Sequence, residues 1–186
     1  MSSDDGGWTL SVREVQIPPL GLAGTLCIPG RACGLVVFVH GSGSSRFSPR
    51  NTQVARALNA RGIATLLFDL LTTEEEADRA NVFDIPRLAG RLLDALRWAD
   101  EEDAASKLPL GLFGASPGAA AALVAAAKLP DRIRAVVSRG GRPDLATSAL
   151  DRVWVPTLLI VGGGDPAVIA LNEAAFARLP GPKALK

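Results

Sequence analysis

The chain has 186 residues, of which 48% are hydrophobic, which suits one domain built on a sheet buried on both faces. Its 20 basic and 19 acidic residues give a formal net charge of +1, and 5% of the residues are aromatic, with no tyrosine. This charge balance gives no electrostatic case for binding nucleic acid or an anionic membrane, and the low aromatic content argues against a base-stacking platform. We therefore expect no nucleic-acid and no membrane partner.

The remaining bulk features favour a cytoplasmic location. The N-terminal residues 1–7 are polar and acidic, without the basic and apolar regions of a signal peptide. The longest apolar run, residues 119–127, is too short to cross a bilayer. Cys27 and Cys33 are the only cysteines, and nothing about them suggests a disulfide scaffold, so reduced thiols are the simpler interpretation.

Strands and helices alternate along the predicted chain. Partly alternating β-rich residues predict an N-terminal antiparallel hairpin over 9–17 and 22–28. Apolar runs predict buried strands over 34–39, 63–70, 108–113, 133–138 and 157–161. Helices are predicted over 49–61, 84–99, 117–129 and 167–179, from apolar residues at helical spacing, from Asp or Pro at helix starts and from Gly at helix ends. Residues 72–81 are interpreted as a polar, acidic connection. The result is an α/β fold with a mostly parallel sheet, one domain over residues 1–186, and ligands at the carboxyl ends of the strands.

The most informative stretch is residues 110–120, in which an apolar strand is followed by G-x-S-x-G and an Ala-rich helix. Such a strand–turn–helix unit lifts a serine hydroxyl above the end of a sheet, and its glycines allow the tight turn and the close packing of strand and helix. Ser116 is therefore a candidate nucleophile. The alternative is a plain strand-to-helix turn with a serine near the helix N-cap.

Other strands also end in unusual loops. His40-Gly41-Ser42-Gly43 follows one strand, Arg139–Arg142 follows another, and Gly163-Gly164-Asp165 follows the last clear one. Dinucleotide binding fits poorly because the third Gly of G-x-G-x-x-G is missing, and no P-loop is present. Serine hydrolysis fits better, with backbone N–H groups of the H-G-x-G loop facing an oxyanion and an acid after a later strand. We expect no cofactor and no metal.

In these stretches the chain resembles the α/β-hydrolase superfamily, and within it the small dienelactone-hydrolase-like esterases. The matching residues are 37–46, 114–118 and 158–165, and the resemblance runs from the hairpin to about residue 180. It implies Ser116 as the nucleophile, Asp165 as the acid that orients a histidine, and oxyanion donors near Ser42. Dienelactone hydrolase itself has a cysteine at the elbow, so Ser116 favours simple ester chemistry. The dozen or so residues between Arg142 and Pro156 leave no room for a lid domain, which suits small soluble esters.

Two departures from the superfamily pattern bear on catalysis. The pattern requires a histidine after the next strand, and the sequence contains no histidine beyond His40. We interpret this as a C-terminally incomplete domain that lacks the last strand and helix. Residues 157–161 would then form an exposed sheet edge and a route to homo-oligomers. In addition, Pro117 occupies the position whose backbone N–H normally serves the oxyanion, and proline has no N–H.

For several side chains the sequence allows two roles. His40 is expected to be a structural part of the oxyanion loop, with a role as the base as the less favoured alternative. Arg46, Arg50, Arg139 and Arg142 could form an anion-binding rim for a carboxylate-bearing ester, but solvated loop arginines are favoured. At the level of the whole chain, the alternatives to a small-ester hydrolase are a non-catalytic hydrolase-like binding protein and, less favoured, a flavodoxin-like ligand-binding domain.

Overall fold

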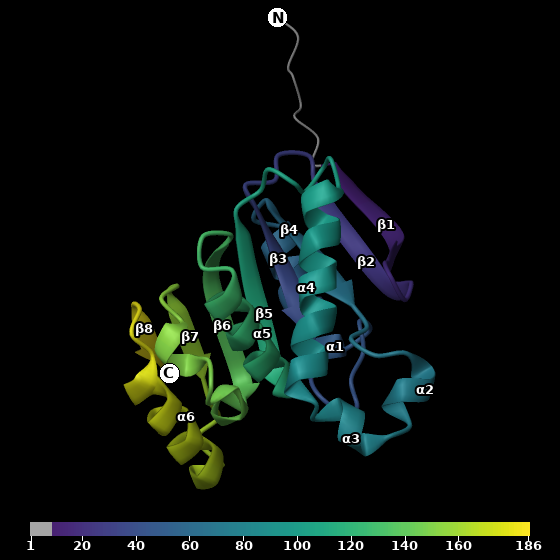
Figure 1. Cartoon of the computed structure of the whole chain (residues 1–186). Helices are drawn as coiled ribbons and strands as arrows, with labels where there is room; N and C mark the ends of the chain where they lie inside the picture. Colours follow the sequence, from purple (N-terminus) through teal and green to yellow (C-terminus); the bar gives the residue numbers. More distant parts are fainter. Residues whose placement is uncertain (1–8) are drawn as a thin grey trace, which may run out of the picture.

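The computed structural model describes residues 9–186 and contains an eight-stranded sheet of order β1-β2-β4-β3-β5-β6-β7-β8 (Figure 1). The strands are β1 (Leu10–Ile17), β2 (Leu22–Pro29), β3 (Gly34–Val39), β4 (Ile63–Phe68), β5 (Leu110–Ser116), β6 (Ile133–Gly141), β7 (Thr157–Ile160) and β8 (Lys183–Leu185). The helices are α1 (Pro49–Asn59), α2 (Thr73–Glu76), α3 (Arg79–Val82), α4 (Ile85–Glu101), α5 (Pro117–Lys128) and α6 (Pro166–Arg178), with short 3₁₀ turns at Pro143–Ala146 and Leu150–Arg152.

The sheet is mostly parallel, as the alternation of strands and helices predicts. β1 pairs with β2 and β2 with β4 in antiparallel register, whereas every other pair of neighbouring strands, from β4–β3 to β7–β8, is parallel. β3 and β5 are adjacent, which brings the loop after His40 next to the turn at Ser116. The predicted α/β-hydrolase-type sheet with an N-terminal antiparallel hairpin is confirmed.

Helices cover both faces of the sheet because its central strands are apolar on both sides. On one face, Phe38, Leu67 and Phe113 form a small cluster with Ala55 of α1. On the other face, their strand neighbours join the main core together with the apolar stripe of α4 and the alanines of α5. In Figure 1, α4 crosses in front of the central strands, and α2 and α3 lie at the lower end of the sheet. No helix within residues 9–186 is both long and apolar enough to span a bilayer.

The segment between β4 and α4 is helical where the sequence predicts a polar connection. Residues 72–81 form α2 and most of α3. Thr72 and Glu75 form a capping box, in which the Thr72 hydroxyl accepts from the Glu75 N–H and the Glu75 carboxylate accepts from the Thr72 N–H. This T-x-x-E signature is readable in the sequence and would have predicted the helix start.

The last residues correct the expectation of a missing strand and a free edge at β7. Lys183–Leu185 form β8, which pairs in parallel with β7 from Thr157↔Lys183 to Leu159↔Leu185. The pairing continues beyond the strand, because the Lys186 N–H donates to the Leu159 carbonyl at 2.9 Å. β7 is therefore covered on both sides, and the predicted route to oligomers through its edge no longer follows.

Candidate active site

Ser116 sits at a sharp turn between β5 and α5. Its backbone has φ 52° and ψ −129°, and it is the only non-glycine residue with a positive φ within residues 9–186. A Cβ added at Gly118 would collide with the Val39 and His40 carbonyls, and one added at Gly114 would lie 2.5 Å from the Ala119 Cα. The two glycines of the motif are therefore required by close backbone packing, which holds the serine in a strained, rarely populated conformation.

The loop after β3 lies directly beside this serine. A Cβ added at Gly41 would come within 2.8 Å of the Ser116 Cβ, so only glycine leaves the serine accessible on this side. Ser42 and Gly43 follow as exposed residues, and Gly43 has a φ of 63°. The structure thus brings the predicted oxyanion loop and the predicted nucleophile together.

His40 is buried and both of its ring nitrogens are engaged by backbone groups. The Leu70 N–H donates to His40 Nε2 at 3.1 Å, and His40 Nδ1 lies 3.0 Å from the Gly41 carbonyl oxygen. A nitrogen that accepts carries no proton, so the ring proton belongs on Nδ1, where it donates to Gly41. These contacts tie the Gly41–Gly43 loop to the end of β4 and leave neither nitrogen directed at Ser116.

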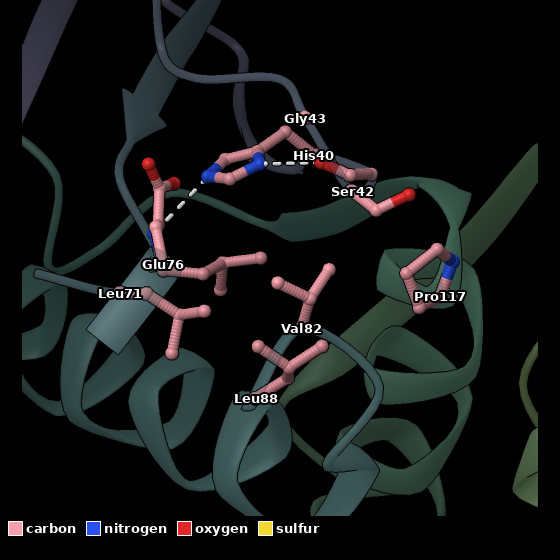
Figure 2. Close-up of a pocket in the computed structure, with 10 residues that line it drawn as sticks. His40, Ser42, Gly43, Leu71, Glu76, Val82, Leu88 and Pro117 are labelled. Carbon is pink, nitrogen blue, oxygen red and sulfur yellow. Dashed lines mark hydrogen bonds between the residues drawn. The ribbon is translucent and has the colours of Figure 1, made fainter. Parts of the chain in front are cut away.

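A cavity of about 110 Å³ opens beside the elbow. One side is formed by the His40–Gly43 loop and Pro117, and the other by apolar side chains that follow β4 and begin α4, namely Leu70, Leu71, Val82 and Leu88, with Glu76. Figure 2 shows Val82 and Leu88 directed toward the space bordered by Ser42 and Pro117. A cavity of this size and lining suits a small acyl or alkyl group.

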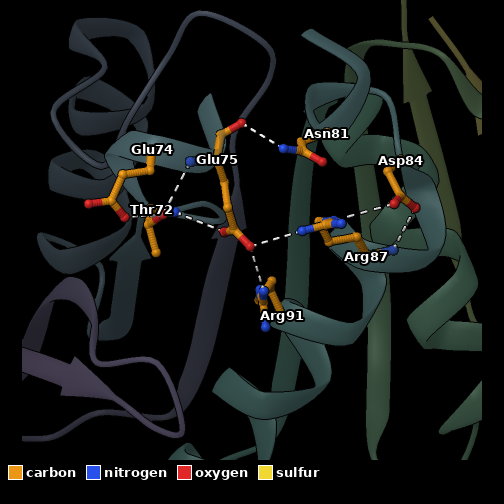
Figure 3. A network of polar contacts seen from close by, with 7 residues as sticks. All are labelled: Thr72, Glu74, Glu75, Asn81, Asp84, Arg87 and Arg91. Atoms are coloured by element: carbon orange, nitrogen blue, oxygen red, sulfur yellow. Dashed lines mark hydrogen bonds and ion pairs between the residues drawn. The ribbon is translucent and has the colours of Figure 1, made fainter. Parts of the chain in front are cut away.

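The α2–α3 wall of the cavity is anchored by Glu75 (Figure 3). Its carboxylate accepts from the Thr72 N–H at 3.1 Å, from Arg87 at 2.9 Å and from Arg91 at 2.8 Å. Burial alone would raise the pKa of Glu75, but the hydrogen bond from Thr72 and the two guanidinium groups together lower it below its ordinary value. The ionised carboxylate therefore fixes this wall to α4.

Asp165, the predicted triad acid, lies exposed at the carboxyl end of β7 and caps α6. Its Oδ1 accepts from the Val168 N–H at 3.1 Å. This is the capping geometry of an N-terminal aspartate. Oδ2 makes no hydrogen bond among residues 9–186, so one carboxylate oxygen can still orient an imidazole.

The four candidate rim arginines separate into two pairs. Arg46 is ion-paired with Asp69, whose other oxygen accepts from the Arg46 N–H at 2.8 Å. Arg142 makes a bidentate pair with Asp144, with distances of 2.7 and 2.8 Å, and this pair raises its pKa. Both charges are compensated locally, which favours a structural role for these two residues.

Arg50 and Arg139 have no carboxylate partner within residues 9–186. Arg50 is exposed in the first turn of α1. Arg139 follows Ser138 near the end of β6, donates to Asn51 Oδ1 at 3.1 Å and lies 5.9 Å from the centre of the Phe113 ring. No cluster of three or more His, Cys, Asp or Glu side chains with metal-binding geometry occurs within the described residues.

Sequence reasoning located the elbow and its loop but not the opposite wall of the cavity. Leu70, Leu71, Val82 and Leu88 come from segments whose apolar residues read as ordinary core or connection. The only usable signal was the capping box at Thr72, because it indicates a helix directly after β4. The engagement of His40 Nε2 depends on the tertiary contact with Leu70, 30 residues away, and has no local signature.

The sequence of this sheet and elbow matches a known protein family. Residues 34–176 match the alpha/beta hydrolase fold family, which covers the sheet from β3 to β7, the elbow and most of α6. The chain belongs to this family.

Among solved structures, a dienelactone hydrolase from Anabaena variabilis superposes with a TM-score of 0.89 at 52% identity, over 96% of this chain and 84% of that one. The dienelactone-hydrolase-like fold predicted from the motifs is thus confirmed. Est1E from Butyrivibrio proteoclasticus superposes with a TM-score of 0.78 at 17% identity, over 94% of this chain and 87% of that one, which is a likeness of fold.

Two curated relatives come from strains of Mycobacterium tuberculosis and carry the name "Putative phosphoribosyl transferase". Each is 58% identical over 171 residues, which is 91% of this chain but 39% of the relative. The chain therefore spans well under half the length of these relatives, and their name describes proteins with a long region that this chain does not match.

Proposed function

We propose that this chain is a hydrolase of small carboxylic esters in which Ser116 is the nucleophile. The observation that carries the proposal is the backbone of Ser116, held at φ 52° between β5 and α5 beside the Gly41 loop. Such a strained serine at the carboxyl end of a parallel sheet is the geometry of a nucleophile elbow. The similar structure at 52% identity is named a dienelactone hydrolase, which supports the same reaction class.

The proposed reaction has two steps. In the first, Ser116 Oγ forms a bond to the ester carbonyl carbon, the bond to the leaving alcohol breaks, and the serine proton passes through a base to the alcohol. In the second, water attacks the acyl-serine, releases the carboxylic acid and returns the proton to Ser116. The cavity lined by Val82, Leu88 and Pro117 would hold the acyl or alkyl group during both steps.

The charge that develops on the carbonyl oxygen needs N–H donors. Pro117 has no N–H, so we assign this task to backbone donors of the exposed loop at Ser42 and Gly43. Loss of one oxyanion donor costs about 10²–10³ in rate in other enzymes, so catalysis that relies on this loop alone is expected to be slow.

A base must also reach Ser116. His40 is unsuited because its two nitrogens are occupied by Leu70 and Gly41. We propose that Asp165 Oδ2 can orient an imidazole other than His40, and that without such an imidazole the chain hydrolyses esters only slowly.

The direct test is turnover of a short-chain p-nitrophenyl ester. Wild-type protein is expected to hydrolyse acetate and butyrate esters above background, and Ser116→Ala is expected to fall to the uncatalysed rate. Ser148→Ala, a change of the same size at an exposed serine, is the matched control and should retain wild-type turnover. Equal turnover in the Ser116 and Ser148 variants would contradict the proposal.

A second candidate is a non-catalytic binding protein with the same fold. Pro117 at the oxyanion position and the occupied nitrogens of His40 favour it. In that case the cavity beside Pro117 would bind a small apolar ligand, and Ser116→Ala would leave ligand binding unchanged while no ester is hydrolysed. We assign phosphoribosyl transfer to neither candidate, because the strand–serine–helix unit presents a hydroxyl nucleophile of the hydrolase type.

A further inference from the structure

Arg139 is a half-buried cation with no carboxylate partner within residues 9–186. Its guanidinium can donate five hydrogen bonds, and the one protein acceptor it has within residues 9–186 is Asn51 Oδ1. Its Nε is buried without any partner. A guanidinium in a partly buried site is normally held by a carboxylate, as Arg46 and Arg142 are, so Arg139 is an exception that calls for an external partner.

A second cation, Arg50, directly precedes Asn51, the residue that Arg139 contacts. Arg50 is exposed in the first turn of α1 and has no carboxylate partner within residues 9–186. Burial, followed by the charge of Arg50, lowers the pKa of Arg139. The first turn of α1 contains no acidic residue, so the positive end of its helix dipole adds to the two charges. Like charges placed together without a counter-charge raise the energy of the unliganded protein, and a bound anion would relieve it.

The side-chain amide of Asn51 also offers a hydrogen-bond donor at this position. The Asn51 side chain is buried, and its Oδ1 is used by Arg139, which leaves its Nδ2 group as a donor with no acceptor among residues 9–186. Arg139, Arg50 and Asn51 therefore offer N–H groups from three side chains, and their one acceptor, Asn51 Oδ1, is already used by Arg139. Such a set matches the oxygens of a carboxylate or a phosphate.

We propose that Arg139, Arg50 and Asn51 form a binding site for an oxyanion, the carboxylate or phosphate group of a small-molecule ligand. This site is not the apolar cavity. Arg139 and Phe113 lie on the face of the sheet that α1 covers, whereas Leu88 of α4 belongs to the core on the opposite face. The site is nevertheless close to the nucleophile along the sheet, because Arg139 is paired in register with Ala115, the residue before Ser116. The proposal requires binding only and does not depend on ester hydrolysis.

The test is titration of the 186-residue protein with inorganic phosphate and, in parallel, with acetate at constant ionic strength, followed by the NMR signals of the arginine Nε–H groups. At least one anion should give saturable shifts of Arg139. We expect Arg139→Gln to weaken binding at least tenfold and Arg50→Gln several-fold. Arg56→Gln removes the same charge from an exposed arginine near the other end of α1 and should bind as the wild type does. Tighter phosphate binding would assign a phosphorylated ligand, and tighter acetate binding a carboxylate.

A charge reversal provides a readout that does not depend on the ligand. Arg50→Glu would supply the missing carboxylate, so it should abolish anion binding and raise the midpoint of thermal unfolding, whereas Arg56→Glu should do neither. The proposal is overturned if neither anion gives saturable shifts in the wild type, or if Arg50→Gln and Arg56→Gln weaken binding equally. Ser116→Ala should bind the anion as the wild type does. The anion titration therefore tests this site separately from the ester assay, which tests the proposed function.

Discussion

At the residue scale, the active-site turn depends on glycines that admit no side chain. Gly118 packs against the Val39 and His40 carbonyls, whereas Gly90, in the middle of α4, has open space around an added Cβ. We predict that Gly118→Ala destabilises the protein by about 1–3 kcal/mol, as overpacking does. Gly90→Ala should stabilise it by about 0.5–1 kcal/mol, since alanine has the higher helix propensity. Urea unfolding of both variants measures the two effects, and equal effects would show that the elbow tolerates a side chain.

A second prediction at this scale concerns His40. His40→Phe removes the acceptor for the Leu70 N–H in a buried site and should cost about 1–3 kcal/mol of unfolding free energy. His40→Gln keeps an oxygen that can accept this bond and should cost less. If His40 were the catalytic base instead, both variants would lose ester turnover to the same extent, whatever their difference in stability. Denaturation midpoints and turnover measured on both proteins decide between the two roles.

At the scale of elements, the cavity wall formed by α2 and α3 depends on the ionised carboxylate of Glu75. A group whose pKa is lowered in the folded protein contributes stability that is complete above its ordinary pKa of 4.5 and is lost as the pH falls through the lowered value. We predict that Glu75→Gln lowers stability at neutral pH but hardly at all in strong acid, where the wild-type carboxyl is also neutral. Glu74→Gln is the matched control, because Glu74 is exposed and its contact with the Thr72 hydroxyl is 3.4 Å long.

The measurement for this prediction is the midpoint of thermal unfolding as a function of pH for the wild type and the two variants. The Glu75→Gln curve should converge with the wild-type curve below pH 4.5, and the Glu74→Gln curve should follow the wild type throughout. A constant offset of Glu75→Gln at every pH would mean that packing and not charge holds the wall.

The elements also show what local sequence can and cannot predict. The strand–serine–helix unit was readable because its glycines and its apolar flanks are consecutive in the chain. The start of α4 was readable as well, since Asp84 caps it by accepting from the Arg87 N–H at 3.0 Å. By contrast, the wall of the cavity, the His40–Leu70 bond, the Arg46–Asp69 pair and the Arg139–Asn51 contact depend on segments far apart in the chain. These contacts follow from the strand order and cannot be read from any single window of sequence.

At the scale of the whole molecule, β8 adds a three-residue strand beside β7. Its pairing covers the backbone of β7, whose side chains include the exposed Ile160. We predict that deletion of residues 183–186 uncovers an apolar strand edge and promotes self-association. Light scattering should detect higher-mass species in the deletion variant and not in the 186-residue chain. An unchanged mass distribution would mean that another segment protects β7.

The central claim for the molecule is that Ser116 is a reactive nucleophile. Its most direct test is reaction of the folded protein with an alkyl fluorophosphonate, followed by peptide mass mapping of the adduct. The proposed account predicts one adduct, on the peptide that contains Ser116, and no adduct in Ser116→Ala or in urea-unfolded protein. Absence of an adduct on the folded wild-type protein, or labelling that persists in Ser116→Ala, would contradict it.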